Sequence, residues 1–426
     1  MKQSATGAGF ARAVKPLSLL LGWGPLGAQA ALLDDSKANL TFRNFYYNHD
    51  LRDAAQPAQS RLEEWAQGFI LKGESGYTDT TVGLGVDVYA GLGLKLDSSP
   101  SRSGTALLPG AYNRAGGPRN TDPRSVDDYS EATAALKIKY SKSELKVGGL
   151  FPKIPLVSSG DARLLPQFFE GVMLDIHELD DIDVGLGQMR KVNQREFAGA
   201  RDIQVGNYYS VFSDRFDYLG ATWLAAPQTS LGLWAGRLQD VYQQTLYTGT
   251  QGFKIGDWNL SVTLNYLDTG ESGSEKAGRL DSRMTSAMLS ANLRAHTFRL
   301  GYQYNAGDSA LPFIHDTDLP GVANAVQVLR FDRAQERSWQ ARYDLDFASL
   351  GVPGLTAFAR YVRGDNFEVA GTDGSEWERN LDVTYVIQSG PLKNLALRWR
   401  NLELRGDATG RRDENRVIIA YTLSLL

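Results

Sequence analysis

The sequence contains no cysteine, and among its 426 residues only four are histidines. The absence of cysteine excludes disulfides, thiolate nucleophiles and thiolate metal sites, and it suits an oxidising compartment without proving one. The histidines His49, His177, His296 and His315 lie in distant segments, and none sits in a recognisable Ser or Asp motif. A hydrolase built on a Ser-His-Asp triad is therefore not favoured.

Long apolar runs and an excess of one charge are also missing. Beyond the N-terminus no stretch approaches the roughly 18 apolar residues of a transmembrane helix, and the mean hydropathy is −0.31. The formal net charge of −4 provides no general basic field for nucleic acid. Helical membrane spans and nucleic-acid binding are therefore not expected.

Two stretches resemble ligand loops only superficially. The glycine pairs Gly83/Gly85 and Gly91/Gly93 lie in the middle of an expected strand, without the following helix that a phosphate loop requires. The stretch 364–376 (GDNFEVAGTDGSE) lacks the calcium-binding spacing of an EF-hand, and we expect a solvated external loop there. We predict no metal and no cofactor.

The first thirty residues differ from the rest of the chain. Lys2, Arg12 and Lys15 precede the apolar run 17–21, and the small-residue triplet AQA follows at 28–30. This order is typical of a secretory signal peptide, so we predict a signal peptide over 1–30, cleaved after Ala30. The mature protein is therefore expected to leave the cytoplasm.

After this segment, apolar and polar residues alternate over many stretches of about ten residues, which is the period of a β-strand. In 80–97, Val82, Leu84 and Val86 begin a run of apolar side chains that share one face. Eighteen such strands are expected, near residues 39–49, 62–73, 80–97, 131–141, 143–150, 168–178, 182–194, 215–225, 229–241, 245–254, 257–267, 284–295, 297–305, 336–347, 354–363, 376–388, 393–404 and 414–425. We place a further candidate, 203–212, in a loop because bacterial single-chain barrels have even strand numbers.

The connections between these strands fall into two classes. The short ones include 141–144, 179–181 and 295–297, and the long ones are 98–130, 151–167, 195–214, 268–283 and 306–335. Short periplasmic turns on one rim and long external loops on the other are typical of an outer-membrane barrel. The sequence therefore predicts an all-β protein in which residues 31–426 form one closed antiparallel transmembrane β-barrel of 18 strands.

A barrel of this size is too wide for side chains to fill, so its lumen holds water and its outer face meets lipid. In 395–404 (LALRWRNLEL), Arg398 and Arg400 then face the lumen while Trp399 faces lipid. The same parity turns Arg43, Arg299, Arg342, Arg360 and Arg416 inward.

The first and last strands of a closed barrel are neighbours, so Arg43, Arg398, Arg400 and Arg416 are expected on one wall. A column of guanidinium groups attracts anions and binds carboxylates in a bidentate manner. The alternative is that each arginine only pairs with a lumen acid such as Asp344, Asp346 or Asp382.

The connection 149–171 (GLFPKIPLVSSGDARLLPQFFEG) contains three prolines and the run Arg163-Leu164-Leu165-Pro166. A solvent-exposed loop would not favour this composition. We expect the loop to fold into the lumen and form a constriction, with Arg163 at the narrowest point and Arg342 and Arg360 assigned to the same constriction.

The stretches RNFYYNHDLR, EEWAQGFIL, DARLLPQFFEG, ERSWQARYDLDF, YVIQSGPLKNLALRWRN and DENRVIIAY resemble the OprD-type porins, or outer-membrane carboxylate channels, from about residue 35 to the C-terminus. The resemblance implies a monomer-sized barrel in the Gram-negative outer membrane, an eyelet shaped by the third and seventh external loops, and a basic ladder that guides carboxylate substrates. Expected partners are a small carboxylate, outer-membrane lipid and lipopolysaccharide, and the barrel-assembly machinery, with the protein a monomer or weak trimer.

By motif position, Arg43 and Arg52 resemble the ladder arginines of the first strand, and Arg163 resembles the arginine of the third loop. Arg398, Arg400 and Arg416 resemble those of the last two strands. Thr384 stands where we would expect a lysine, which leaves the ladder one position short.

Several substrate classes stay open. One subgroup of the family takes basic amino acids and needs acidic groups in the eyelet, whereas the other takes aromatic or small organic carboxylates. The stretch 319–340 and the ending YTLSLL look more like the second. The alternatives are a general-diffusion or sugar porin, although a sugar pore usually shows aromatic residues where this lumen repeats arginine, and an outer-membrane hydrolase barrel.

Overall fold

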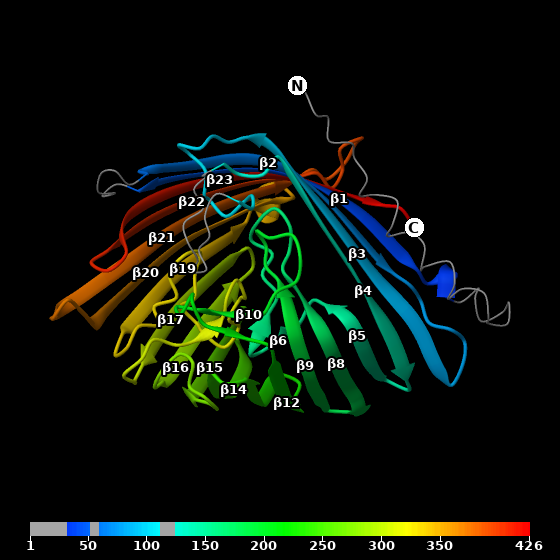
Figure 1. The fold of residues 1–426 in the computed structure, drawn as a ribbon, viewed down its shortest axis with the longest axis horizontal. Coiled ribbons are helices and arrows are strands. Elements are labelled where there is room, and N and C mark those ends of the chain that lie inside the picture. The colour runs from blue at the N-terminus through cyan, green and yellow to red at the C-terminus, as the bar shows by residue number, and fades with distance from the viewer. Residues whose placement is uncertain (1–31, 52–58, 111–123) are drawn as a thin grey trace, which may run out of the picture.

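The computed structural model describes residues 32–51, 59–110 and 124–426, in which eighteen antiparallel strands form one sheet. The sheet closes because β1 pairs with β23, with Asn39 opposite Ser424 and Leu51 opposite Arg412. Figure 1 shows these terminal strands, blue and red, side by side on one wall. The predicted 18-stranded closed barrel is confirmed, whereas the signal peptide and Arg52 lie outside the described residues.

Every predicted strand is present, with ends shifted by a few residues. The barrel strands are β1 (Lys37–Leu51), β2 (Arg61–Glu74), β3 (Val82–Asp97), β4 (Asp128–Tyr140), β5 (Ser143–Leu150), β8 (Phe168–Leu179), β9 (Ile182–Asn193), β12 (Phe216–Ala226), β13 (Thr229–Leu238), β14 (Tyr242–Ile255), β15 (Trp258–Glu271), β16 (Asp281–Leu293), β17 (His296–Asn305), β19 (Arg337–Asp346), β20 (Leu355–Val369), β21 (Thr372–Val386), β22 (Ala396–Gly406) and β23 (Gly410–Ser424).

Segment 203–212 lies outside the barrel wall, as predicted. Within it β10 (Ile203–Gly206) pairs with β11 (Phe212–Ser213) and with β18 (Phe313–Ile314) in a separate small sheet. Loop 151–167 holds its own short hairpin, β6 (Lys153–Ile154) with β7 (Val157–Ser158). These short strands belong to connections and not to the wall.

We call the rim where β1 begins and β23 ends the terminal rim and the opposite one the loop rim. Turns 141–142, 180–181 and 294–295 lie on the terminal rim, and loops 98–127, 151–167, 194–215 and 306–336 on the loop rim. The division is not strict, since 387–395 on the terminal rim is longer than several connections of the loop rim.

The expected external loop at 364–376 is wrong. Strand β20 continues to Val369, and β21 begins at Thr372. The two linking residues, Ala370 and Gly371, have φ of 50° and 82°. A two-residue turn with both φ values positive matches the twist of a β-hairpin, so the strands continue almost to its tip.

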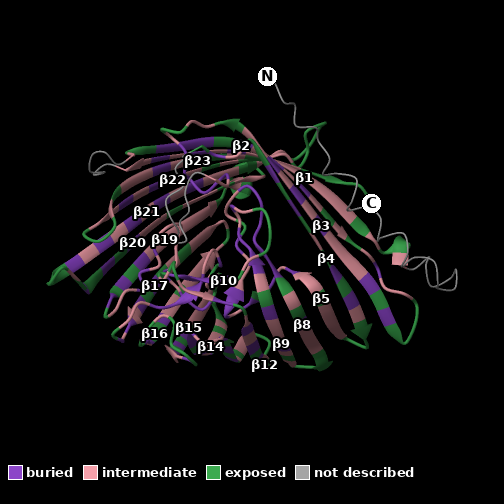
Figure 2. Cartoon of the chain, in the orientation of Figure 1, coloured by how far each residue is buried: buried purple, intermediate pink, exposed green. Residues whose placement is uncertain are grey.

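The alternation of side chains follows the predicted parity. Along β3, Val82 and Leu84 are each 45% exposed, while Gly83 and Gly85 are buried. Figure 2 shows the resulting change from exposed to buried along several strands. A broad apolar band therefore covers the outside of the wall. No helix of the described residues is long and apolar enough to cross a membrane.

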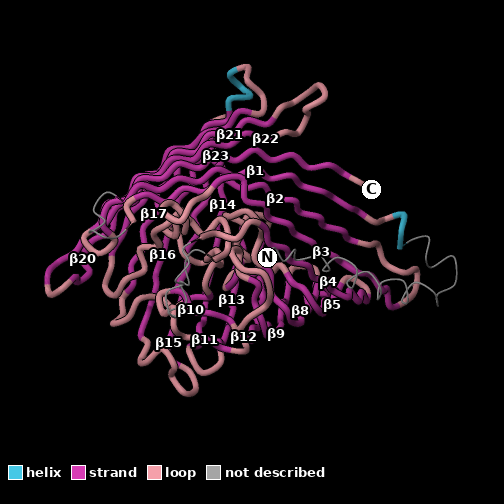
Figure 3. The backbone as a smooth tube through the Cα atoms, turned by 45° about the horizontal axis from the view of Figure 1, so that its top comes forward, coloured by secondary structure: helices cyan, strands magenta, loops and turns pink. Residues whose placement is uncertain are grey.

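The inner face is less polar than the sequence suggested. Leu164 and Leu165 of loop 151–167 are fully buried in a cluster with Phe45 and Tyr47 of β1, and a second cluster packs Phe331 of loop 306–336 against Leu402 of β22 and its neighbours. Loops thus bring apolar side chains against the inner wall, and Figure 3 shows loop segments inside the ring of strands. Part of the lumen is therefore filled.

Candidate functional site

The strands on both sides of the barrel closure carry Arg43, Arg398, Arg400 and Arg416, and we call this part of the inner face the arginine wall. Strand β22 pairs with β23, which places Arg400 opposite Arg416 and Arg398 opposite Ile418. Strand β23 also pairs with β1, which places Arg43 opposite Ala420. The closure therefore brings side chains from the two ends of the sequence onto adjacent strands.

A cavity of about 320 Å³ lies against this wall and beneath loop 151–167. Polar side chains in its lining come from both the wall and the loop, and small or apolar residues complete the surface. The lining consists of Arg43, Phe45, Asp161, Ala162, Arg163, Thr384, Ala396, Arg398, Arg400, Ile418 and Ala420. Four guanidinium groups and one carboxylate therefore surround one space.

Arg398 and Arg400 share a single carboxylate. Arg398 donates to Asp382 in a bidentate manner, with Nη2 2.6 Å from Oδ2 and Nε 3.0 Å from Oδ1, and Arg400 Nε lies 3.1 Å from Oδ2. The side chain of Asp382 is only 5% exposed, whereas that of Arg398 is 41% exposed. One carboxylate neutralises one of two guanidinium groups, so a net positive charge is left at the cavity.

Arg43 connects the wall to loop 151–167. Its Nη1 and Nη2 donate to the two carboxylate oxygens of Asp161, at 2.7 and 3.1 Å. Nη1 also donates to the backbone carbonyl of Arg163 at 2.8 Å. Arg43 therefore holds the loop in place while its half-buried side chain still lines the cavity.

Arg163 reaches the cavity from the loop. Its guanidinium lies over the Tyr47 ring, 5.3 Å from the centroid, and Nη1 donates to the carbonyl of Ala162 at 3.0 Å. No carboxylate among the described residues lies within ion-pair distance of it. Burial lowers the pKa of Arg163 to about 10, so the group remains charged at neutral pH.

Arg416 points inward but does not line the cavity. Its side chain is 1% exposed, and Nη2 donates to the Tyr47 hydroxyl at 2.7 Å and to Glu414 at 2.8 Å. The guanidinium also covers the Tyr47 ring, 4.3 Å from the centroid. Tyr47 and Glu414 were not predicted as site residues, although both share the inward parity of Arg43 and Arg416.

Arg342 lines a second cavity of about 390 Å³ nearer the terminal rim, which shares Thr384 and Arg398 with the first. Arg342 donates to Asp344, with Nη2 2.6 Å and Nε 3.1 Å from Oδ1, and Arg299 also pairs with Asp344. Neither Arg342 nor Arg360 lines the cavity beneath loop 151–167.

The other lumen residues named from the sequence have different partners. Arg360 donates to the side-chain oxygen of Asn380 at 2.8 Å. Asp346 accepts from the backbone N–H of Ala348 and caps a 3-10 turn at Phe347–Leu350. Thr384 lies opposite Arg398 on the neighbouring strand, where it lines both cavities without adding a charge.

Three loops interlock above the first cavity. Ser158 and Asp318 exchange backbone hydrogen bonds of 3.3 and 2.9 Å, which joins loop 151–167 to loop 306–336. Gln167 Nε2 donates to the carbonyl of His315 at 2.8 Å. The buried pair Arg195–Asp316 joins loop 194–215 to the same segment.

Asp316 lies at the centre of the contact among the three loops, close to the backbone of Gly160 and paired with Arg195. A Cβ on Gly160 would lie 2.1 Å from the carbonyl oxygen of Asp316, so only glycine fits there. Burial alone would raise the pKa of Asp316, but the charge of Arg195 and its hydrogen bond, with His315 and Arg163 nearby, lower it well below the usual value. The Arg195–Asp316 pair is therefore ionised throughout the physiological range.

Loop 306–336 is also fixed directly to the wall. Glu378 of β21 accepts hydrogen bonds from the backbone N–H groups of Gln327, Val328 and Leu329, at 3.1, 3.2 and 2.8 Å. The glutamate is fully buried, so these donors replace its hydration. No group of three or more acidic or histidine side chains suited to a metal occurs in the described part of the chain.

A closed barrel with an outer apolar band, a partly filled lumen and a charged inner wall defines a membrane channel of the porin class. The family described as "outer membrane porin, OprD family" matches residues 30–425. The chain belongs to this family, as its motifs indicated.

Named relatives and solved structures agree with this assignment. The chain is 38% identical to porin-like protein GalP of Pseudomonas putida, over 94% of this chain and 95% of that protein. It is similar to the Pseudomonas aeruginosa OccK9 (OpdG) structure, with 45% identity, a TM-score of 0.88, and 93% and 100% of the two chains covered. It is also similar to Pseudomonas aeruginosa OpdK solved with vanillate, with 38% identity, a TM-score of 0.85, and 92% and 100% covered.

These findings establish an outer-membrane porin channel and not an enzyme. The prediction of the family and of the fold is confirmed. The identity of the molecule that passes, and the part played by each arginine, belong to the proposal that follows.

Proposed function

We propose that this porin takes up small organic carboxylates, aromatic ones above all, through the cavity beneath loop 151–167. One observation carries the proposal: in that cavity Arg163, Arg398 and Arg400 stand beside an apolar surface that includes Phe45 and Ile418. The carboxylate of a substrate is bound by guanidinium groups, and its apolar body lies against the side chains of β1 and β23.

The charge balance of the cavity favours an anion. Asp382 serves both Arg398 and Arg400, and Arg163 has no ion-pair partner within the described ranges. A carboxylate that enters therefore meets guanidinium groups whose donors are not all engaged. Arginine donates to a carboxylate through two parallel N–H groups, which gives orientation as well as attraction.

The same lining disfavours basic amino acids. Its one acidic side chain is Asp161, and both oxygens of that carboxylate already accept hydrogen bonds from Arg43. The substrate's own ammonium group would find no free counter-ion in this cavity. OpdK, solved with vanillate, is a relative associated with an aromatic carboxylate, which supports the choice of that class here.

We infer a division of labour among the arginines predicted from the sequence. Arg398, Arg400 and Arg163 contact the substrate, Arg43 positions the loop, and Arg342 and Arg299 extend the basic surface toward the terminal rim beside Asp344. Arg416 supports Tyr47 from beneath. Arg52, which lies outside the described residues, is proposed as a further arginine of the ladder, as the motif match implies.

Export and membrane insertion are proposed from the sequence alone. Residues 1–30 direct export and are removed after Ala30, and the barrel-assembly machinery inserts the mature chain into the outer membrane as a monomer or weak trimer. Mass spectrometry of the mature protein tests the first step, since a different N-terminus would contradict the cleavage position.

Transport experiments test the proposed substrate class. Purified protein in liposomes is given benzoate, arginine or a neutral sugar of similar size, and the reversal potential is measured in planar bilayers under a salt gradient. We expect benzoate to enter faster than either competitor and the potential to show anion preference. Equal entry of the sugar would instead identify a general-diffusion porin, and faster entry of arginine would identify the basic-amino-acid subgroup.

A further inference from the structure

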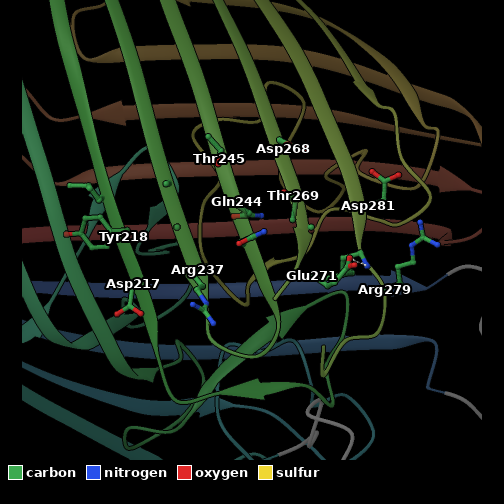
Figure 4. A pocket seen from close by; sticks show the side chains of 16 residues that line it. Asp217, Tyr218, Arg237, Gln244, Thr245, Asp268, Thr269, Glu271, Arg279 and Asp281 are labelled. Atoms are coloured by element: carbon green, nitrogen blue, oxygen red, sulfur yellow. Dashed lines mark hydrogen bonds between the residues drawn. The ribbon is translucent and has the colours of Figure 1, made fainter. Parts of the chain in front are cut away.

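Three loops fill one side of the lumen. Leu156, Val205 and Leu311, one from each loop, belong to a buried apolar cluster with Trp234 and Leu246 of the wall. The hollow of about 620 Å³ across β12 to β16 lies on the outer face of these strands, where Figure 4 shows its charged side chains, so it offers no passage. Strands β22, β23 and β1 lie across the ring from this cluster. A molecule that crosses the barrel is therefore directed to the cavity beneath loop 151–167.

Three alanines line this cavity from two sides. Ala396 of β22 lies directly opposite Ala420 of β23, and this pair is one inward position nearer the terminal rim than Arg398. Ala162 comes from loop 151–167. We call the part of the cavity lined by Ala162, Ala396 and Ala420 the alanine slot. The wall and the loop both contribute methyl groups to it, and none of its own side chains carries a charge.

Arg43 fixes the loop side of the alanine slot relative to the wall side. Its backbone lies opposite Ala420 on the neighbouring strand. Its guanidinium donates to the carboxylate of Asp161 at 2.7 Å and to the backbone carbonyl of Arg163 at 2.8 Å, the residues directly before and after Ala162. One side chain therefore spans from Ala420 to both neighbours of Ala162. The separation of the two sides is set by the length of this arginine, so the slot does not widen freely for a larger molecule.

The alanine slot lies on the path of the apolar part of a substrate. Thr384 and Arg398 line both this cavity and the one of about 390 Å³ nearer the terminal rim. A carboxylate bound to Arg398 can therefore move from one cavity to the other while the rest of the molecule passes beside Ala396 and Ala420. The charged end stays with the guanidinium groups, so the slot acts on the body of the molecule alone.

We propose that the alanine slot is the size filter of this channel, which admits a flat ring and rejects a bulkier carboxylate of the same charge. This inference rests on the proposed uptake of aromatic carboxylates and adds the residues that limit the size of the ring. Charge selection belongs to the arginines, and size selection belongs to Ala162, Ala396 and Ala420.

Uptake of benzoate and acetate into liposomes that contain the full-length barrel tests this proposal. Ala396→Leu and Ala420→Leu each replace a methyl group with a branched side chain and change no charge. Benzoate uptake should fall at least tenfold in each variant, which is the scale on which a pocket discriminates by a few carbon atoms, whereas acetate uptake should stay within about twofold of the parent. Arg398→Ala should instead slow both acids, because it acts on the carboxylate that they share.

The matched control is Ala359→Leu on β20, which adds the same bulk to an exposed outward position, since the neighbouring Phe358 and Arg360 contact each other on the inner face. It should transport both acids as the parent does. The opposite change, Ala420→Gly, should speed the entry of adamantanecarboxylate, which the parent should admit at least tenfold more slowly than benzoate. Such a gain cannot come from misfolding, and the shift between boiled and unboiled protein on a detergent gel checks that every variant is folded.

Three results would overturn the size filter. They are unchanged benzoate uptake in both folded leucine variants, equal slowing of acetate and benzoate in those variants, and equal entry of adamantanecarboxylate and benzoate in the parent. Each is distinct from a failure of the proposed function, which is read from benzoate against arginine and sugar in the parent. A parent that prefers benzoate, with leucine variants that transport it normally, would reject the alanine slot alone.

Discussion

At the scale of single residues, Asp382 controls how much net positive charge Arg398 and Arg400 bring to the cavity beneath loop 151–167. It is buried and pairs with both Arg398 and Arg400. Replacing it with asparagine keeps the shape but removes the negative charge, so two guanidinium groups face the cavity uncompensated. We expect Asp382→Asn to shift the reversal potential toward stronger anion selectivity and to slow the release of benzoate.

The control for this substitution is Asp257→Asn at the terminal rim, whose carboxylate is highly exposed and has Arg294 as its one ion-pair partner among the described residues. It removes the same charge at a distance from the wall. A reversal potential that moves equally in both variants would show that net charge, and not the Asp382 site, sets selectivity.

Arg416 is expected to affect stability more than transport. Its guanidinium is buried against Tyr47 and Glu414 at the closure between β23 and β1. Removing one member of a buried ion pair typically costs about 3–5 kcal/mol, and the lower value applies because Arg412 still pairs with Glu414. Arg416→Ala should unfold at lower denaturant concentration, whereas Arg398→Ala should not. Equal stability of the two variants would contradict the buried role.

At the scale of elements, strand β22 separates transport from assembly along three consecutive residues. Arg398 and Arg400 line the cavity, and Trp399 is 41% exposed on the outer face. Arg398→Ala/Arg400→Ala should leave a folded barrel but slow benzoate uptake, more strongly at low salt because screening reaches about 10 Å at 0.1 M.

Trp399→Arg is the matched opposite, since a charge on the lipid face costs about 2–4 kcal/mol at mid-depth. It should impair assembly, which is read from the shift between boiled and unboiled protein on a detergent gel. The assignment of the two faces fails if the double alanine variant transports normally at low ionic strength. It also fails if that variant does not fold while Trp399→Arg is tolerated.

Loop 151–167 is expected to limit the width of the channel. Arg43 holds it from one side, and the Ser158–Asp318 backbone pair holds it from the other. Deleting 155–165 should raise the single-channel conductance severalfold. Gly160→Ala should displace the loop more gently, because its Cβ would meet the Asp316 carbonyl at 2.1 Å, and should give a noisier current. An unchanged conductance in the deletion would place the constriction elsewhere.

At the scale of the whole molecule, the loop assembly should resist acid. The folded-state pKa of Asp316 is lowered, so the stability that this carboxylate contributes is present above its unfolded pKa of about 3.9 and is lost only as pH falls through the lower folded value. Single-channel conductance should therefore be constant from pH 7 to about 4. Asp316→Asn removes the ionised partner of Arg195 and should show larger or less stable conductance already at pH 7.

A conductance that changes with pH in this range would contradict the prediction. If the conductance of the parent protein rises between pH 6 and 4, a group other than Asp316 opens the loops. His315 would then be the first candidate, since its Nε2 lies 3.5 Å from the Asp316 carboxylate.

The sequence by itself determined the barrel. Alternation with a period of two identifies each strand and the direction of each side chain, and it placed Arg398 inward and Trp399 outward without any tertiary information. Closure follows because unpaired backbone groups are not tolerated in lipid. The same local rules failed at 364–376, where a two-residue turn at Ala370 and Gly371 lacks the usual Asn-Gly or Asp-Gly signal.

The tertiary structure decided which arginines line the cavity and which are buried. Parity treats Arg398 and Arg416 alike, yet the first lines the cavity while the second is buried by Tyr47 and Glu414. The closure of the barrel brings Tyr47 of β1 opposite Arg416 of β23, and loops that return into the lumen cover this pair, because Gln327 donates to Glu414 and Arg163 lies over the Tyr47 ring. A strand pattern is local and fixes only the face of a side chain, whereas its partners depend on strand closure and on the path of the loops.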